Sequence, residues 1–145
     1  MRLSEKTLEL NICAQMHTVV APRTRLLWFG LTQRQEARWG FDACTRLGGR
    51  LLMFQFKASN HVLRNGARRY QLGHRQLTAL QALAGSYQRS VFYAFPLVGN
   101  TRELAKSKSL LHDTWLLDLA RLPALAAPTK RDGTPRRNGH HNAQV

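Results

Sequence analysis

Two adjacent glycines, Gly48 and Gly49, constrain the fold of this chain more than any other feature of its sequence. The segments on either side, residues 41–47 and 50–58, are mainly apolar and aromatic runs of the length typical of strands. Both glycines accept the positive φ angles that a two-residue hairpin turn requires. The sequence therefore predicts two antiparallel strands joined by a tight turn.

The position of the turn also predicts which side chains meet. If Leu47 pairs with Arg50, then Asp42 lies directly opposite Gln55. Opposed residues share a face of the sheet, with Cβ atoms about 4.5–5.5 Å apart. Lys57 emerges on the same face because side chains alternate along a strand. We therefore expect Asp42, Gln55 and Lys57 to converge at one end of the hairpin.

The surroundings of this cluster favour a functional role. Lys57 ends the apolar run of residues 51–56, which is typical of a central strand, where Lys and Gln pack poorly. Polar groups buried in such a strand must be paired or bound to a ligand. The alternative is an incidental pair on an edge strand, which would contribute about 0–1 kcal/mol.

Periodicity and capping residues outline the rest of the fold. Helices are predicted where apolar residues recur every three to four positions, and strands where short β-prone runs occur. The predicted helices cover residues 4–16, 33–39, 74–87 and 106–112, and the further strands cover residues 25–30, 69–72 and 90–97. Residues 115–120 fit either a strand or a helix. This order predicts an α/β (α+β) fold, in which helices flank a mixed central sheet that contains the hairpin.

The charge of the chain favours a polyanionic partner. Lys and Arg number 22 against 8 Asp and Glu, which gives a formal net charge of +14. A surface this basic attracts polyanions, with nucleic acid favoured and anionic lipid as the main alternative, and phosphate contacts gain free energy from the release of counterions. The composition changes near residue 124, so we expect one folded domain over residues 1–123 and a basic, flexible tail over residues 124–145, with His140 and His141 free in solvent.

Several features indicate a cytoplasmic protein without a membrane segment. No apolar run approaches the roughly 18–20 residues that span a bilayer, and the N-terminal residues lack the apolar core of a signal peptide. Cys13 and Cys44 lack metal-ligand spacing and lie in apolar stretches, so both are expected to be reduced thiols.

The hairpin residues resemble the active site of the PD-(D/E)xK nuclease superfamily. Phe41-Asp42 stands where that family has Pro-Asp, and Gln55-Phe56-Lys57 stands where it has Glu-x-Lys. The Gln-x-Lys form is similar to that of Mrr-type restriction endonucleases. The helix before the hairpin and the helix and strand after it also resemble the restriction endonuclease-like core. The resemblance covers roughly residues 4–100.

What the resemblance implies is a metal-dependent nuclease that hydrolyses DNA phosphodiester bonds, in restriction, phage defence or repair. Asp42 and Gln55 would hold Mg²⁺ (or Mn²⁺), an ion that prefers oxygen ligands, and Lys57 would orient or activate the attacking water. In the family a further carboxylate often comes from the first helix. We expect Glu9 as a catalytic residue and metal ligand, because Glu5 is explained as a first-turn acid; Glu36 is a rival.

Residues after the lysine strand are candidates for contact with DNA. Arg64, Arg68, Arg69 and Arg75 are basic, and Gln76 stands where the family often has a polar helper residue. A homodimer, or a subunit of a larger nucleic-acid-processing complex, is compatible with this size. Two alternatives remain: a catalytically silent nuclease-like DNA- or RNA-binding module, and an assembly subunit that binds an acidic partner.

Overall fold

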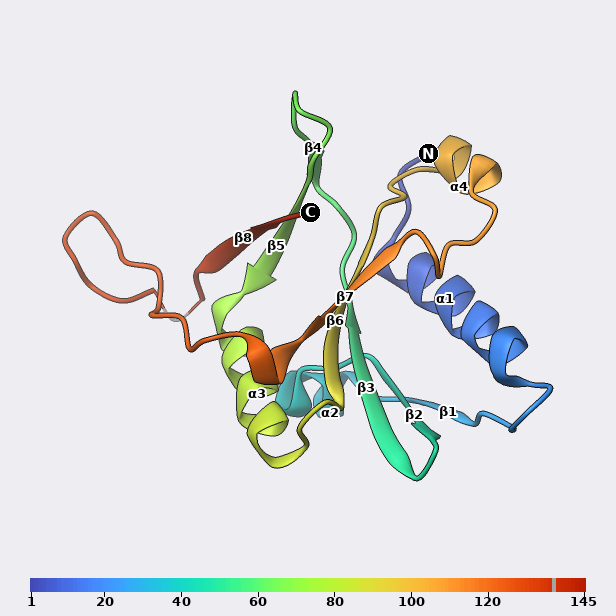
Figure 1. Cartoon of the computed structure of the whole chain (residues 1–145). Coiled ribbons are helices and arrows are strands. Elements are labelled where there is room, and N and C mark those ends of the chain that lie inside the picture. Colours follow the sequence, from blue (N-terminus) through green and yellow to red (C-terminus); the bar gives the residue numbers. More distant parts are fainter. Residues whose placement is uncertain (137) are drawn as a thin grey trace.

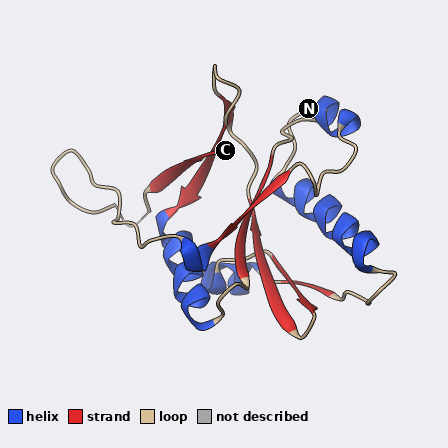
Figure 2. Cartoon of the chain, in the orientation of Figure 1, coloured by secondary structure: helices blue, strands red, loops and turns tan. Residues whose placement is uncertain are grey.

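A computed structural model describes residues 1–136 and 138–145, which form two sheets with helices packed on them (Figures 1 and 2). The helices are α1 Glu5–Val20, α2 Gln33–Trp39, α3 His74–Ser86 and α4 Thr101–Lys106, with a 3₁₀ turn at Leu119–Arg121. The strands are β1 Trp28–Gly30, β2 Ala43–Leu47, β3 Arg50–Phe56, β4 His61–Val62, β5 Arg68–Gly73, β6 Val91–Pro96, β7 Thr114–Asp118 and β8 His140–Gln144. The α/β fold class with a mixed sheet is confirmed.

The hairpin of β2 and β3 lies inside the larger sheet, whose strand order is β1-β2-β3-β6-β7. Gly48 and Gly49 have φ angles of 56° and 76°, as a two-residue turn requires. Leu47 pairs with Arg50, and the ladder continues to Ala43 and Phe54, so the predicted register is confirmed. β6 runs parallel to β3 on its other side, which makes β3 a central strand.

Helices cover both faces of this sheet. α1 lies on one face and α2 and α3 lie on the other (Figure 1). On the first face Leu8 and Ile12 pack against the apolar side chains of β3 and β6. On the second face Leu77 and Leu80 pack against Tyr93 and the strands around it. The polar residues of the hairpin lie at the end of the central strand β3, and helices cover the sheet on both faces (Figure 1).

The smaller sheet has the order β4-β5-β8 and corrects the expectation of a flexible tail. β8 pairs antiparallel with β5, from Arg69↔Gln144 to Gly73↔His140. The ring of His141 is not free in solvent, because its Nε2 lies 3.0 Å from Nδ1 of His74. Strand β8 forms without apolar periodicity in its sequence. It is stabilised by its backbone hydrogen bonds to β5 and by Ala143, which packs against the core.

In the C-terminal part, one helical expectation is wrong and one open alternative is resolved. The helix expected over residues 106–112 is wrong: helix α4 ends at Lys106 and is capped at its start by Asn100, whose side chain accepts a hydrogen bond from the Glu103 amide at 3.0 Å. Residues 115–120 divide between a strand that ends at Asp118 and the 3₁₀ turn that follows it.

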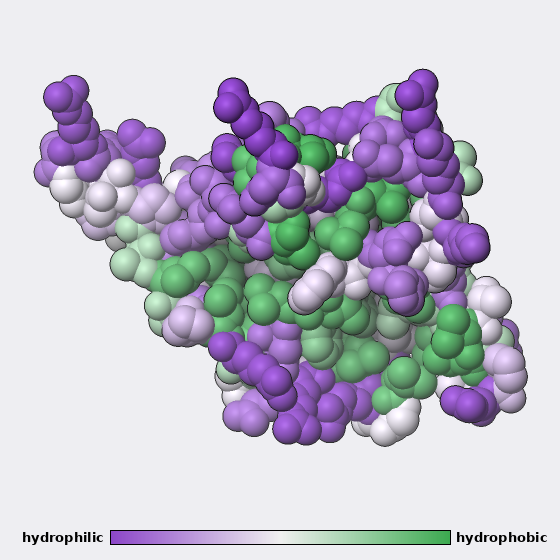
Figure 3. All heavy atoms as spheres, turned by 45° about the horizontal axis from the view of Figure 1, so that its top comes forward, coloured by the Kyte–Doolittle hydropathy of each residue, from purple (hydrophilic) through white to green (hydrophobic). Residues whose placement is uncertain are grey.

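The surface is mixed in character. Hydrophilic side chains cover the rims of the face in Figure 3, and apolar side chains are exposed across its middle. Strand β7 forms one edge of the larger sheet and exposes Trp115 and Leu116. Among the residues that the structure describes, no helix has the length and apolar character needed to cross a membrane.

Candidate functional site

Asp42 lies just before β2 and joins it to the end of β3. Its Oδ2 accepts two hydrogen bonds, one from the backbone N–H of Phe56 at 2.8 Å and one from Nε2 of Gln55 at 2.8 Å. The structure thus brings Asp42 and Gln55 together, as the glycine turn predicts. Because the second bond joins side chain to side chain, it fixes both polar groups at one point of the sheet.

The amide of Gln55 is buried and only partly satisfied. The residue is 2% exposed. Its Nε2 also donates to the carbonyl oxygen of Phe56 at 3.2 Å, whereas its Oε1 is buried and has no hydrogen-bond partner in the described part of the chain. A buried amide oxygen without a partner costs about 1–3 kcal/mol. The hairpin therefore keeps an unsatisfied acceptor beside a carboxylate.

Three groups surround one point at this end of the hairpin. Oδ2 of Asp42 and the carbonyl oxygen of Phe56 both accept from Nε2 of Gln55. Rotation of the Gln55 amide by half a turn would exchange its nitrogen and its oxygen. Three oxygens would then face each other, an arrangement that needs a cation or a proton between them.

Burial changes the protonation of Asp42. Desolvation is the largest cause and raises the pKa of Asp42 to about 6. The N–H of Phe56 and the charge of Lys57 lower this pKa, and the charges of Glu5 and Glu9 raise it. Burial outweighs the favourable contacts, so the ionised carboxylate is under-stabilised near neutral pH.

Lys57 lies beside a carboxylate from the first turn of α1. Its Nζ is 3.6 Å from Oε1 of Glu5, and its side chain is 11% exposed. The same oxygen of Glu5 accepts from the backbone N–H of Ala58 at 3.4 Å. The capped start of α1 therefore places one carboxylate next to the last residue of the predicted triplet.

The structure places Glu5, rather than Glu9, at this end of the sheet. Glu9 pairs with Lys6 at 2.7 Å and lines a different pocket, beside Trp28 and Ala43 on the opposite face. Glu36 lies on α2 and also contacts neither Gln55 nor Lys57 in the described structure. Glu9, the helix carboxylate that the sequence predicts, lies one helical turn further along α1 than Glu5 and faces a different pocket.

The described part of the chain contains no metal cluster made only of strong ligands. Within residues 1–136 and 138–145, no group of three or more His, Cys, Asp or Glu side chains could hold a metal ion. The oxygens near the hairpin end come instead from one carboxylate, one amide and one backbone carbonyl. Such a set is poor in charge but is made of the hard ligands that Mg²⁺ accepts.

Tyr93 belongs to the same end of the sheet and was missed by sequence reasoning. It pairs with Gln55 across β3 and β6, and it is 0% exposed. Its hydroxyl has no hydrogen-bond partner in the part of the chain that is described. Burial first, and then the charges of Asp42 and Glu5, raise its pKa. The signal was a tyrosine inside an apolar strand, a position where the hydroxyl needs a partner.

Two pockets lie near this end of the sheet, and neither is lined by Asp42 or Gln55. The smaller pocket, of about 500 Å³, is lined by Glu5 and Lys57 and by residues of the smaller sheet. The larger pocket, of about 840 Å³, is lined by residues of α2, of the start of α3 and of the segment before β8. Three residues line both pockets: Gly73, Gln76 and His140.

The residues proposed to contact DNA fall into different environments. Arg75 is exposed and lines the larger pocket, and Gln76 lines both pockets. Arg64 is exposed in the turn between β4 and β5 and lines neither pocket. Arg69 lies on β5 with its Nε buried and without a partner among the described residues.

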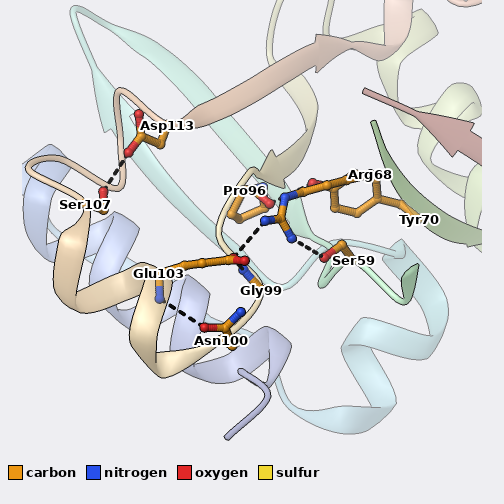
Figure 4. A network of polar contacts seen from close by, with 9 residues as sticks. All are labelled: Ser59, Arg68, Tyr70, Pro96, Gly99, Asn100, Glu103, Ser107 and Asp113. Carbon is orange, nitrogen blue, oxygen red and sulfur yellow. Dashed lines mark hydrogen bonds and ion pairs between the residues drawn. The ribbon is translucent and has the colours of Figure 1, made fainter. Parts of the chain in front are cut away.

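Arg68 is part of a structural network instead (Figure 4). Its Nη2 lies 2.8 Å from Oε2 of Glu103, and its Nη1 donates to Oγ of Ser59 at 3.2 Å. The same Glu103 oxygen accepts from the N–H of Gly99 at 2.7 Å. The guanidinium of Arg68 therefore joins β5 to the loop before α4, and its contact with DNA stays a prediction.

The chain matches no protein-family model, and comparisons with curated proteins and with solved structures gave no significant match. The assignment of function therefore depends on the geometry of the site itself.

Proposed function

We propose that this protein is a metal-dependent nuclease that hydrolyses phosphodiester bonds of DNA. The observation that carries the proposal is the convergence of the Asp42 carboxylate, the Gln55 amide and the Phe56 carbonyl on one point, with Lys57 directly after the end of β3. The resemblance of these residues to the PD-(D/E)xK pattern supports the same reaction.

The residues fit a hard divalent cation. Asp42 provides a carboxylate whose pKa is raised mainly by burial, so that a cation would stabilise its ionised form. Gln55 provides a buried oxygen that lacks a partner among the described residues. Asp42, Gln55 and the Phe56 carbonyl would hold Mg²⁺ or Mn²⁺, which supplies charge stabilisation for the phosphate and lowers the pKa of a bound water.

Lys57 and Glu5 complete the proposed chemistry. The ammonium of Lys57 stabilises negative charge on a phosphate oxygen or orients the attacking water, as a buried point charge does in a water-poor site. Glu5 accepts from the backbone and pairs with Lys57 at 3.6 Å, a distance that leaves the ammonium free to donate to a substrate. Glu5 therefore acts as a positioning residue for Lys57.

Nicking of supercoiled plasmid tests this proposal. We expect Mg²⁺- or Mn²⁺-dependent nicking by the wild type, and a loss of about 100-fold or more in Lys57→Ala with DNA binding unchanged, because an interaction with the transition state is removed. Lys106→Ala, a change of the same kind on exposed α4, is the control and should nick normally. A wild type that never nicks, or Lys57→Ala that nicks at full rate, would refute the proposal.

A matched pair on α1 tests the role of the helix carboxylate. Glu5→Gln should reduce nicking by about tenfold, whereas Glu9→Gln, one turn along the same helix, should leave the rate within about twofold. The reverse order would show that Glu9, as the sequence predicts, serves the site.

A catalytically silent nucleic-acid-binding module is the second candidate. It is favoured by the lack of a three-ligand acidic group among the described residues and by the neutral Gln55 in a position where a Glu would add charge. In that case the wild type binds DNA in a salt-dependent manner, and neither Mg²⁺ nor Mn²⁺ produces nicked plasmid.

A further inference from the structure

The larger pocket and the smaller pocket, which Lys57 lines, are neighbours, and we call the two together the groove. Gly73 and Gln76 at the start of α3 and His140 at the start of β8 line both of them. The groove runs from α2, past the start of α3, to the side chain of Lys57. A substrate bound in the larger pocket would therefore lie next to the pocket that Lys57 lines.

The far end of this groove is rich in arginine. The larger pocket is lined by Arg34 and Arg38 of α2 and by Arg75 of α3, and Glu36 is the one acid in its lining. None of the three arginines forms an ion pair with an acid within the described residues, in contrast to Arg68. Arg38 stacks over Trp39 at 5.0 Å, which leaves the edge of its guanidinium available for hydrogen bonds.

The smaller sheet turns a polar face toward the near end of the groove. Cross-strand pairing places Gln71 opposite Asn142 and Gly73 opposite His140, so the exposed side chains of these pairs share a face. Tyr70 and Leu72 point to the other side and are buried in the core. Because Gln71 and His140 line the smaller pocket, this polar face forms part of its wall.

We infer that the groove holds the phosphodiester backbone of a DNA substrate, with Arg34, Arg38 and Arg75 contacting phosphates remote from the reacting one. This inference rests on the proposed function, which places the reacting phosphate at Lys57. Free guanidinium groups pair with phosphate oxygens through two parallel hydrogen bonds. The volume of about 840 Å³ is larger than one phosphate group needs, so the larger pocket can take a stretch of backbone.

Two triple variants that remove the same charge test the inference. One replaces Arg34, Arg38 and Arg75 with Ala; the control replaces Arg46, Arg50 and Arg102, which are exposed and line neither pocket. Affinity for a labelled DNA duplex is measured by fluorescence anisotropy over a range of salt, in EDTA. A second groove variant with Arg→Gln at the same positions preserves helix propensity if the Ala variant unfolds.

We expect the groove variant to bind at least about tenfold more weakly, with the slope of log K against log salt reduced by about 2 to 3, since each phosphate contact contributes about 0.9. The control variant should change affinity by less than about threefold. Equal losses in the two variants would show that net charge alone matters and would overturn the inference. A groove variant that loses affinity for an RNA duplex but keeps its affinity for DNA would also overturn it.

The binding assay separates this inference from the proposed function. Because EDTA removes metal, binding is measured without cleavage. Loss of binding in the groove variant together with a wild type that never nicks plasmid supports the groove and refutes the nuclease. Normal binding and nicking by the groove variant refute the groove and leave the nuclease intact.

Discussion

Two polar clusters in this protein join strands to loops in similar ways but differ in how completely their atoms are paired. In the Arg68 network, Glu103 accepts from the N–H of Gly99 and from Arg68, both within 2.8 Å (Figure 4). In the hairpin cluster, Oε1 of Gln55 and the hydroxyl of Tyr93 are buried with no partner in the described chain.

The pKa values of the two acids are shifted in opposite directions: that of Glu103 is lowered and that of Asp42 is raised. Burial acts to raise the pKa of Glu103, but hydrogen bonds from Gly99 and Arg68 outweigh it and the pKa is lowered. At Asp42 burial wins, and the pKa rises to about 6. A saturated cluster such as the Arg68 network stabilises the fold, whereas the unpaired atoms of the hairpin cluster are what make it the candidate site.

The largest expected effect is on the free energy of unfolding, which should change in opposite directions when the acid of each cluster is replaced by its amide. Asp42→Asn should raise the free energy of unfolding at pH 8 by about 1–3 kcal/mol, because it removes a buried charge while its amide oxygen can still accept from Phe56. Glu103→Gln should lower it by about 1–2 kcal/mol, because charge-assisted hydrogen bonds to Arg68 are lost. Urea denaturation in EDTA measures both.

The same two variants should also differ in their plasmid-nicking activity. Asp42→Asn should abolish plasmid nicking, while Glu103→Gln should nick normally because Glu103 lies in the other cluster. If both variants lose stability, or if Asp42→Asn nicks normally, the distinction between the clusters fails.

The pH dependence of stability gives the next effect. The pKa of Asp42 is raised from 3.8 to about 6 on folding, so the folded state binds the proton more tightly. Its contribution is fully present below pH 3.8 and is lost as the pH rises through 6, a total of about 3 kcal/mol at 1.36 kcal/mol per pH unit. The difference between wild type and Asp42→Asn, measured in EDTA from pH 4 to pH 8, should follow this curve.

The difference is needed because another group titrates in the same range. Burial, and then the charge of His74, lower the pKa of His141, so its contribution to stability falls as the pH drops below 6.5. This contribution is common to wild type and Asp42→Asn and cancels. A flat difference curve would contradict the burial of an ionisable Asp42.

A smaller effect is expected for Gln55→Glu. Without metal, a second carboxylate would face Asp42 in place of the donated hydrogen bond at 2.8 Å, and stability should fall by about 1–2 kcal/mol. With 5 to 10 mM Mg²⁺, roughly the range that saturates weak sites, this loss should be recovered. Thermal melting with and without Mg²⁺ measures the recovery, and Gln33→Glu, at an exposed position of α2, should show none.

The parts of the fold that sequence predicted are those decided locally. The turn at Gly48 and Gly49 sets the hairpin register without help from distant residues. Helix α2 is capped at its start by Thr32, which forms a capping box, and at its end by Gly40 in the left-handed conformation. The meeting of Asp42 and Gln55 follows from the same local geometry, so this half of the site was predictable.

The other parts depend on contacts between distant segments. Strand β8 forms because a stretch without apolar alternation pairs with β5, more than sixty positions earlier, as the His74–His141 contact shows. Glu5 and Glu9 lie one turn apart on the same helix, and only the docking of α1 on the sheet decides which one reaches Lys57. A local sequence pattern specifies neither the strand with which a segment pairs nor the position in which a helix docks on a sheet.

Titration of the metal-free protein with Mn²⁺, followed by calorimetry and by the paramagnetic resonance of the free ion, tests whether the end of the hairpin holds a divalent cation. The account predicts one site per chain in the wild type and in Glu103→Gln, and a loss of affinity of about tenfold or more in Asp42→Asn. Binding of equal strength in Asp42→Asn, or no binding by the wild type, would contradict it.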